Sequence, residues 1–219
     1  MKEFDYSQVK DYKFYDFAKN GFGWLIKAIF RMKFKGTENI PEKGGYILAV
    51  NHVSLVDPFF VALPKRMHKL HFMAKAELFS NSVMSWLVTH LNGFPVRRGK
   101  GDTAAIDYGI KVLEEGHVMA ICPEGKRIKD MGGVPQKPKA GVAAIAKATG
   151  ADILPVAIYS DGNIKPFKRV TVVYGELIKN ESLGMSEEST PREIKNAAMM
   201  IMGKITELWE KEKNGSNIG

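Results

Sequence analysis

The sequence predicts a single-domain α/β fold, in which helices flank a central sheet of mostly parallel or mixed strands, preceded by an amphipathic N-terminal helical segment. Short apolar runs alternate with longer segments whose apolar residues recur at helical spacing. That alternation is typical of strands connected by helices. With 219 residues and 45% hydrophobic content, the chain can bury a substantial core without splitting into two domains.

Local patterns justify each element in turn. Strands are expected where short runs are apolar or alternate with polar residues, at 46–50, 70–74, 117–121, 153–159 and 169–174. Polar and apolar residues alternate along the last of these, so it should be half-exposed. Helices are expected where apolar residues line one face or stop signals close a segment, at 58–63, 82–91, 103–115, 141–149 and 191–211. Pro155 indicates an edge strand or a bulge, since proline cannot donate to a ladder.

The first candidate site follows the apolar run 46–50, where Asn-His-Val-Ser-Leu-Val-Asp-Pro occupies residues 51–58. A histidine accepts a proton near neutral pH when a partner holds its other ring nitrogen in one tautomer. His52 and Asp57 can form such a pair only across a turn, because neighbours on a helix lie three or four positions apart. The competing interpretation is a helix start, with Asp57 as N-cap and Pro58 in the first turn. Both interpretations can hold together.

Two further segments place cations beside turn-forming residues. Residues 92–99 read Asn-Gly-Phe-Pro-Val-Arg-Arg-Gly, and residues 121–127 read Ile-Cys-Pro-Glu-Gly-Lys-Arg. Arginine suits phosphate because its planar fork donates parallel hydrogen bonds and stays charged. Glycine permits close approach of the backbone to a ligand. Either segment alone is a weak signal, because paired surface cations are usually solvated.

Taken in order, the segments resemble the glycerolipid acyltransferase family, and most of all its bacterial 1-acyl-glycerol-3-phosphate (lysophosphatidic acid) acyltransferases. The resemblance spans residues 34–177. Its four blocks are Asn-His-x4-Asp, Gly-x-Phe-Pro-Val-x-Arg, Phe-Pro-Glu-Gly-Thr-Arg and Val-Pro-Val, matched at residues 51–57, 93–98, 122–127 and 154–156. The chain departs from the family at Cys122, which replaces an aromatic or aliphatic residue, at Lys126, which replaces Thr, and at Arg97, where many members have Asp. The extra cations would strengthen binding of an anionic head group.

The resemblance implies an enzyme of phospholipid biosynthesis, peripheral or monotopic on the cytoplasmic face of the cell membrane. It would transfer a fatty acyl chain from a thioester carrier, acyl-CoA or an acyl carrier protein, to the free hydroxyl of lysophosphatidic acid, giving phosphatidic acid. His52 would be the general base, oriented by Asp57, and the hydroxyl would attack the thioester directly. No cofactor is implied beyond the thioester co-substrate. The implied substrate-binding residues are Arg98, Glu124, Gly125 and Arg127, with Arg97 and Lys126 as helpers specific to this chain.

Aromatic and basic residues are concentrated in residues 1–35, which contain ten aromatic residues, and eight Lys or Arg against four Asp or Glu. Between Phe22 and Met32 the apolar residues cover a broad helical arc, leaving Lys27 and Arg31 on the remaining face. Such a helix suits a lipid interface, although packing on the core is the ordinary alternative. The segment is too short and too interrupted to span a bilayer. The expected regions are a membrane-interface segment at 1–35, an acyltransferase domain at 36–213 and a disordered tail at 214–219.

Other functions stay open on the sequence. The acceptor could be glycerol-3-phosphate or another lysolipid, the protein could be a catalytically silent lipid-phosphate-binding protein, or water could replace the hydroxyl and make it a hydrolase. Cys122, the single cysteine, is better explained as a small hydrophobe than as a thiol nucleophile. The net charge of +8 would also suit nucleic acid, but no nucleic-acid-binding motif is present. No metal is predicted, because His68 and His71 could share a helix face but no ligand pattern accompanies them.

Overall fold

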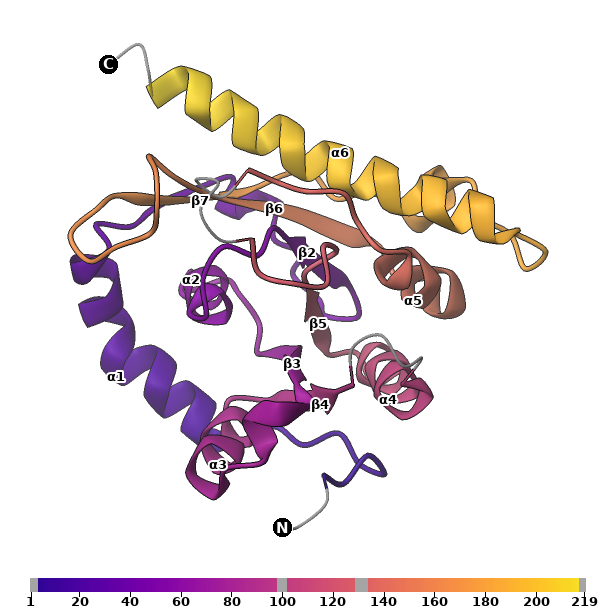
Figure 1. Ribbon diagram of the computed structural model, residues 1–219, viewed down its shortest axis with the longest axis horizontal. Coiled ribbons are helices and arrows are strands. Elements are labelled where there is room, and N and C mark those ends of the chain that lie inside the picture. Colours follow the sequence, from indigo (N-terminus) through magenta and orange to yellow (C-terminus); the bar gives the residue numbers. More distant parts are fainter. Residues whose placement is uncertain (1–3, 98–101, 129–133, 217–219) are drawn as a thin grey trace.

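The computed structural model describes residues 4–97, 102–128 and 134–216. Within these ranges seven strands form one sheet in the order β1-β7-β6-β2-β5-β3-β4 (Figure 1). All neighbouring strands are parallel except β6 and β7, which are antiparallel. The strands are β1 (Lys33–Lys35), β2 (Ile47–Val50), β3 (Leu70–Lys75), β4 (Gly93–Val96), β5 (Val118–Ile121), β6 (Ile153–Ser160) and β7 (Val170–Tyr174).

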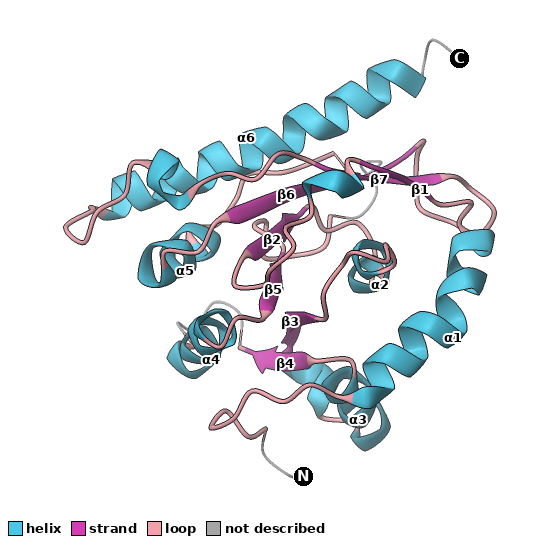
Figure 2. Ribbon diagram, turned by 180° about the vertical axis from the view of Figure 1, so that it is seen from behind, coloured by secondary structure: helices cyan, strands magenta, loops and turns pink. Residues whose placement is uncertain are grey.

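Helices cover both faces of this sheet, as the two opposite views show (Figures 1 and 2). One face carries α1 (Lys13–Ile29), α2 (Asp57–Ala62) and α3 (Ser82–His90), and the other carries α4 (Thr103–Glu114), α5 (Gly141–Thr149) and α6 (Pro191–Ser216). The predicted α/β fold with a mixed, mostly parallel sheet is therefore confirmed.

The core is divided between the two faces by the alternation of side chains along each strand. In the central strand β2, Ile47 and Ala49 pack in the cluster that includes α4, α5 and α6. Leu48 and Val50 pack in the cluster that includes α1 and α2. All four side chains are buried, which is why this strand reads as a continuous apolar run, as expected of a parallel strand covered on both sides.

The parallel arrangement brings the sequence blocks to one edge of the sheet. Strands β2, β4 and β5 run in the same direction, and each is followed by one of the blocks. The stretch 51–57 follows β2, Arg97 follows β4, and 122–127 follows β5. Open α/β sheets bind ligands at this carboxyl edge, so the topology gathers the candidate residues from three separate parts of the chain.

The N-terminal region is more closely joined to the sheet than the sequence indicated. Strand β1 lies within the expected segment 1–35 and pairs with β7 at the edge of the sheet. Phe4, Tyr6 and Val9 pack against the core cluster beneath α4. The boundary at residue 35 therefore falls at the end of a sheet strand and not between two regions. None of the helices within the described ranges is long and apolar enough to cross a bilayer.

The expectation of a half-exposed strand at 169–174 was wrong, and the expectation for Pro155 was right in one of its two alternatives. β7 is almost wholly buried, including Thr171, because β1 pairs along its outer side and both of its faces are covered. Pro155 lies in an interior strand, between β2 and β7, so the edge-strand interpretation was wrong. The bulge interpretation was right, because the chain opposite β6 carries one extra residue between the pairs Val156–Tyr174 and Ile153–Ile178. The Pro155 carbonyl accepts the N–H of Gly175 within this irregular stretch.

Two further expectations are corrected. His71 lies in β3 and not on a helix face shared with His68, because the run from Leu70 completes a buried strand. The disordered tail was expected from residue 214, but α6 continues to Ser216, carried by the helix-forming residues that precede the tail. Residues 217–219 of the expected tail lie outside the described ranges.

Candidate active site

The His52 side chain lies against Asp57 across the turn that follows β2. Its Nδ1 is 2.8 Å from Asp57 Oδ2. The same carboxylate accepts the backbone N–H of Val53 at 2.8 Å and that of Ser54 at 2.9 Å. The turn thus folds around a carboxylate that is 1% exposed, while the imidazole remains partly open to solvent. The two residues meet across a turn, as their spacing predicted.

Asp57 does not cap α2, so the N-cap interpretation was wrong. The helix begins at Asp57 itself, with Val56 as N-cap and no side-chain cap hydrogen bond. The carboxylate is engaged by N–H groups that precede the helix and by the imidazole. Burial raises the pKa of the Asp57 carboxyl, and its hydrogen bonds act in the opposite direction. A carboxylate at Nδ1 directs the Nδ1 proton toward itself, which leaves Nε2 of His52 as the proton acceptor.

Glu124 fixes the backbone of His52. Its Oε2 accepts the His52 N–H at 2.7 Å, and its Oε1 accepts the N–H of Gln136 at 3.2 Å. The His52 carbonyl in turn accepts the N–H of Ile128 at 2.9 Å. The block after β5 therefore holds both sides of the residue that carries the imidazole. Burial raises the pKa of Glu124 to about 7, against the effect of its two backbone hydrogen bonds.

A tight turn at Gly125 shapes the same block. Gly125 has a φ of 69°, and its N–H donates to the carbonyl of Cys122 at 3.0 Å. A Cβ at this position would also lie 2.8 Å from Cδ of Lys139. The positive φ favours glycine, whereas the end of the flexible Lys139 side chain could move aside. The residue between Glu124 and the two cations therefore serves to close the turn.

Asn51 joins the end of β2 to β6. Its amide oxygen accepts the N–H of Ile158 at 2.7 Å, and its amide nitrogen donates to the carbonyl of the same residue at 3.0 Å. The side chain is completely buried, so it replaces a ladder step where the β2 backbone turns away. The motif 51–58 gave Asn51 no role of its own. Its place directly after four buried strand residues was the signal of this role.

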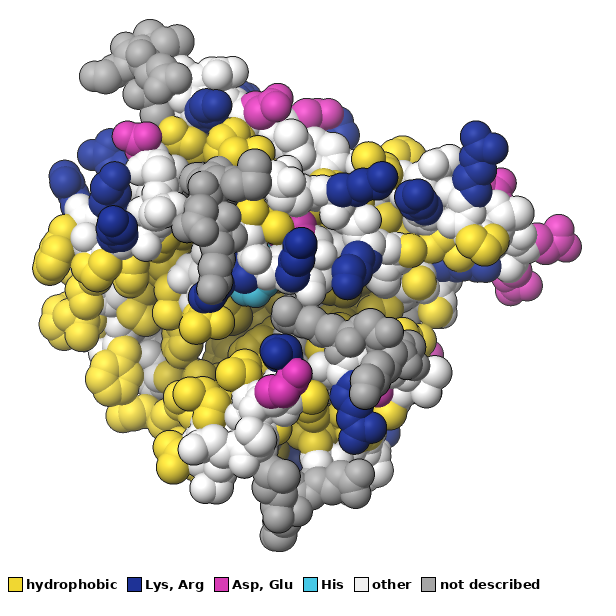
Figure 3. Space-filling view, viewed as in Figure 1, with side chains coloured by type: hydrophobic (Ala, Val, Ile, Leu, Met, Phe, Trp, Pro, Cys, Tyr) yellow, Lys and Arg dark blue, Asp and Glu magenta, His cyan; other side chains and the backbone are white. Residues whose placement is uncertain are grey.

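Three of the four predicted cations lie within the described residues and differ in exposure. Arg127 is half-buried, whereas Lys126 and Arg97 are exposed. The backbone N–H of Arg97 donates to Asp102, the N-cap of α4, at 2.8 Å. Arg98 lies outside the described residues. Figure 3 shows a hollow on this face, with a histidine side chain at its rim, Lys and Arg side chains around it and hydrophobic side chains below.

Cys122 fits the small-hydrophobe interpretation. It follows β5, is partly buried and packs against the cluster of buried residues that includes α2. A small apolar side chain at the end of a buried strand needs no catalytic role.

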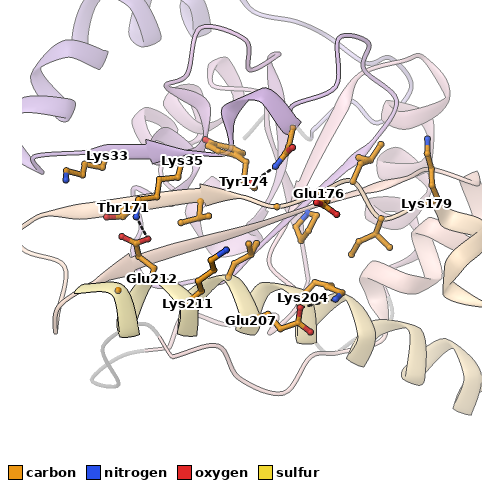
Figure 4. A pocket seen from close by; sticks show the side chains of 18 of the residues that line it. Lys33, Lys35, Thr171, Tyr174, Glu176, Lys179, Lys204, Glu207, Lys211 and Glu212 are labelled. Atoms are coloured by element: carbon orange, nitrogen blue, oxygen red, sulfur yellow. Dashed lines mark hydrogen bonds and ion pairs between the residues drawn. The ribbon is translucent and has the colours of Figure 1, made fainter. Parts of the chain in front are cut away.

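A separate groove of about 1120 Å³ lies between β1, β7 and α6. Lys35 and Glu212 form an ion pair there at 2.6 Å (Figure 4). Neither His52, Asp57 nor Glu124 lines it. The groove is therefore separate from the His52–Asp57 pair, although Pro155 of the fourth block is among its lining residues.

Comparisons with known proteins agree with this geometry. The family model described as Acyltransferase matches residues 31–159. The chain is 30% identical over 143 residues to the 1-acyl-sn-glycerol-3-phosphate acyltransferase of Bacillus subtilis, covering 65% of this chain and 70% of that one. It is 28% identical over 200 residues to the Streptococcus pneumoniae enzyme of the same name, covering 89% and 71%.

A solved structure extends the likeness to three dimensions. The crystal structure of the 1-acyl-sn-glycerophosphate (LPA) acyltransferase PlsC from Thermotoga maritima matches with a TM-score of 0.67 and 25% sequence identity, covering 91% of this chain and 78% of that one. The matched family region contains the first three blocks and the Leu-Pro-Val strand. On the family match, the four blocks and the fold, the chain belongs to the Acyltransferase family.

Proposed function

We propose that this protein transfers a fatty acyl chain from a thioester carrier to the free hydroxyl of lysophosphatidic acid, giving phosphatidic acid. The observation that carries the proposal is the 2.8 Å contact between His52 and a buried Asp57 at the carboxyl edge of the sheet. The relatives named as 1-acyl-sn-glycerol-3-phosphate acyltransferases support the choice of acceptor. The carrier is acyl-CoA or an acyl carrier protein.

The proposed reaction needs one proton acceptor and no covalent enzyme intermediate. Nε2 of His52 takes the proton from the lipid hydroxyl while the hydroxyl oxygen attacks the thioester carbonyl carbon. The resulting oxyanion collapses, the carbon–sulfur bond breaks, and the proton on His52 passes to the departing thiolate. Asp57 holds the ring through Nδ1 and stabilises the imidazolium that forms in between. We propose that no resident cofactor takes part in these steps.

The acceptor phosphate would be held by the cations that follow β5 and β4. Arg127 is the principal candidate, because it is half-buried and lies one residue before Ile128, whose N–H bonds to the His52 carbonyl. That bond ties the position of the cation to the position of the base. We propose Lys126, Arg97 and Arg98 as additional contacts, and Gly125 as the turn that presents them.

The membrane surface is the proposed location, on the cytoplasmic face. We define the aromatic patch as the exposed apolar side chains of α1 and α3, each at least 40% exposed. Ring contacts join the two helices through Phe14, whose ring centroid lies 5.0 Å from that of Trp86 and 6.0 Å from that of Phe17. Hydrophobic side chains gather along the α1 side of the molecule in Figure 3. The patch consists of Phe17, Phe22, Trp24, Leu25, Val83, Met84 and Trp86.

Seven exposed apolar side chains on two neighbouring helices favour membrane contact, because soluble monomers rarely leave large contiguous apolar patches in water. Aromatic side chains also prefer the headgroup region of a bilayer. The sequence indicated only the α1 part of this surface. α3 adds Val83, Met84 and Trp86, which lie in a segment that the sequence predicted only as a helix.

Labelled acyl transfer tests the function. The purified protein with acyl-CoA, or with an acylated carrier protein, should give phosphatidic acid from lysophosphatidic acid. His52→Ala should lower kcat by about 10²–10⁴-fold, the usual contribution of a general base, while His68→Ala serves as the matched control. Phosphorylated product from glycerol-3-phosphate alone would reassign the acceptor. Free fatty acid without a lipid product would identify a hydrolase, and no turnover of either donor would favour a silent binding protein.

The phosphate clamp is tested by Arg127→Ala. Loss of a charge-assisted hydrogen bond to phosphate should raise KM for lysophosphatidic acid by about tenfold or more, with KM for the thioester unchanged. The control is Arg66→Ala, which removes an exposed arginine whose Nη2 lies 4.0 Å from Glu42 Oε1 and donates to the Ile40 carbonyl at 3.4 Å. An effect confined to the thioester would contradict the assignment.

Glu124 gives the protein a predictable dependence of stability on pH. Its pKa in the folded state is about 7, above its ordinary value of 4.5. A raised pKa means that the folded state binds the proton more tightly, so this contribution is complete below pH 4.5 and is lost as pH rises through about 7. The loss is on the order of 3 kcal/mol. In urea unfolding from pH 5 to 8, the free energy of unfolding of Glu124→Gln should not show this loss.

The quantity compared is the difference in free energy of unfolding between the wild-type protein and Glu124→Gln. The contributions of other titrating groups cancel in this difference. Glu124→Gln should be the less stable protein at pH 5, because an amide nitrogen then faces a backbone N–H. This difference in free energy of unfolding should become smaller as pH rises, because only the wild-type protein loses the contribution of Glu124. A gap that stays constant from pH 5 to 8 would show that Glu124 titrates normally and is not held as described.

Vesicle sedimentation tests the aromatic patch. A triple variant should bind phosphatidylcholine–phosphatidylglycerol vesicles about tenfold or more weakly; its substitutions are Phe17→Ser, Trp24→Ser and Trp86→Ser. Each substitution removes apolar area that the bilayer would otherwise bury. Met199→Ser with Met200→Ser, which replaces exposed apolar residues of α6, is the control. Equal binding by both variants would place the membrane contact elsewhere.

A further inference from the structure

Three metal-ligating side chains meet at the edge of the sheet opposite His52. His71 lies in β3, His117 directly precedes the neighbouring strand β5, and Asp11 lies on the segment that leads into α1. His71 Nε2 is 3.0 Å from Asp11 Oδ1, and the two imidazole ring centroids are 5.0 Å apart. One ligand atom from each residue lies within 4.8 Å of the other two.

Surrounding contacts hold the Asp11 carboxylate and the backbone of His117 in place. The Asn92 amide donates to Asp11 Oδ1 at 3.2 Å and accepts the N–H of Tyr12 at 3.2 Å. Asn92 is buried and has a φ of 63°, so it is a fixed support for the carboxylate. His117 is held through its backbone, which donates to the Val112 carbonyl and accepts the N–H of Gly45, both at 3.0 Å. Supports of this kind orient the ligands of metal sites.

Hydrogen bonds between protein groups do not account for all three side chains of the cluster. The His71–Asp11 contact accounts for one imidazole nitrogen and the carboxylate. The His117 ring, by contrast, forms no hydrogen bond with any described residue, although it faces that pair. Lys69 is the opposing charge, with Nζ 3.6 Å from Asp11 Oδ2, but it lies nearer to Asp16, at 3.0 Å.

We propose that Asp11, His71 and His117 form a binding site for a divalent transition-metal ion of the zinc class. Two imidazoles and one carboxylate favour zinc over calcium or magnesium, which prefer oxygen ligands. Zinc bound tetrahedrally at about 2.0–2.1 Å places its ligand atoms about 3.4 Å apart, between the 3.0 Å contact and the 4.8 Å limit of this cluster. Small side-chain rotations therefore suffice, and His117 is partly exposed, so solvent can supply the remaining ligand.

A metal ion at this site would stabilise the fold and would take no part in acyl transfer. His71 and His117 lie at the beginning of parallel strands, whereas His52 follows the end of β2, so the two sites occupy opposite edges of one sheet. A bound ion would tie the segment before α1 to β3 and β5. It would thereby fix the start of the helix that carries most of the aromatic patch.

Calorimetric titration of the tag-free, chelator-treated full chain with zinc sulfate tests the proposal. The wild-type protein should bind one zinc ion per chain and unfold at a higher temperature with zinc present. Asp11→Asn and His117→Gln should each weaken binding by at least tenfold and lose the thermal shift. His68→Gln and His90→Gln remove histidines outside the cluster and should bind as the wild type does. The buried His71 is left unchanged, so that loss of binding does not reflect misfolding.

Two results would overturn the proposal. One is the absence of zinc binding to the wild-type protein at millimolar concentration. The other is unchanged binding in Asp11→Asn and His117→Gln, which would assign the ion to other residues. Cobalt(II) in place of zinc gives an independent readout, because a visible absorption band should form in the wild type and be lost in the two cluster variants.

Discussion

The rest of the site depends on the hydrogen bonds by which the loop after β5 holds the backbone of His52. Glu124 accepts the His52 N–H, and the carbonyl of the same residue accepts the N–H of Ile128. A side chain on a loop can serve as a base only if its backbone is fixed. Because that loop also carries Arg127, the same contacts that fix the proton acceptor set its relation to the proposed phosphate-binding cation.

This local grip relies on the order of strands in the sheet. β2 lies between β5 and β6, so the turn that carries His52 is reached from one side by the loop after β5 and from the other by β6. Asn51 makes the second connection with two hydrogen bonds to Ile158. A buried amide and a buried carboxylate each cost free energy unless they are paired. Their pairing makes the site depend on three strands being in register.

Some of this could be predicted from the sequence and some could not. The alternation of apolar runs and amphipathic segments indicated most of the helices and strands, and the spacing of His52 and Asp57 indicated a pair across a turn. The edge strands β1 and β4 were missed, because Lys-Phe-Lys and Gly-Phe-Pro-Val are not continuous apolar runs like those of the equally short β2 and β5. The interior position of Pro155 depends on the order of the strands around β6, which is a tertiary fact. The cluster of Asp11, His71 and His117 joins residues from three distant parts of the chain, and no local spacing signals it.

The central claim is that Asp57 holds His52 as a neutral base whose free nitrogen is Nε2. Nitrogen-15 NMR of histidine-labelled protein measures this directly, with His52→Ala assigning the resonances. At pH above the histidine titration, the account predicts a protonated Nδ1 and an unprotonated Nε2. In Asp57→Asn that preference should be lost. A proton on Nε2 in the wild type, or tautomers in the ratio of free imidazole, would contradict the account.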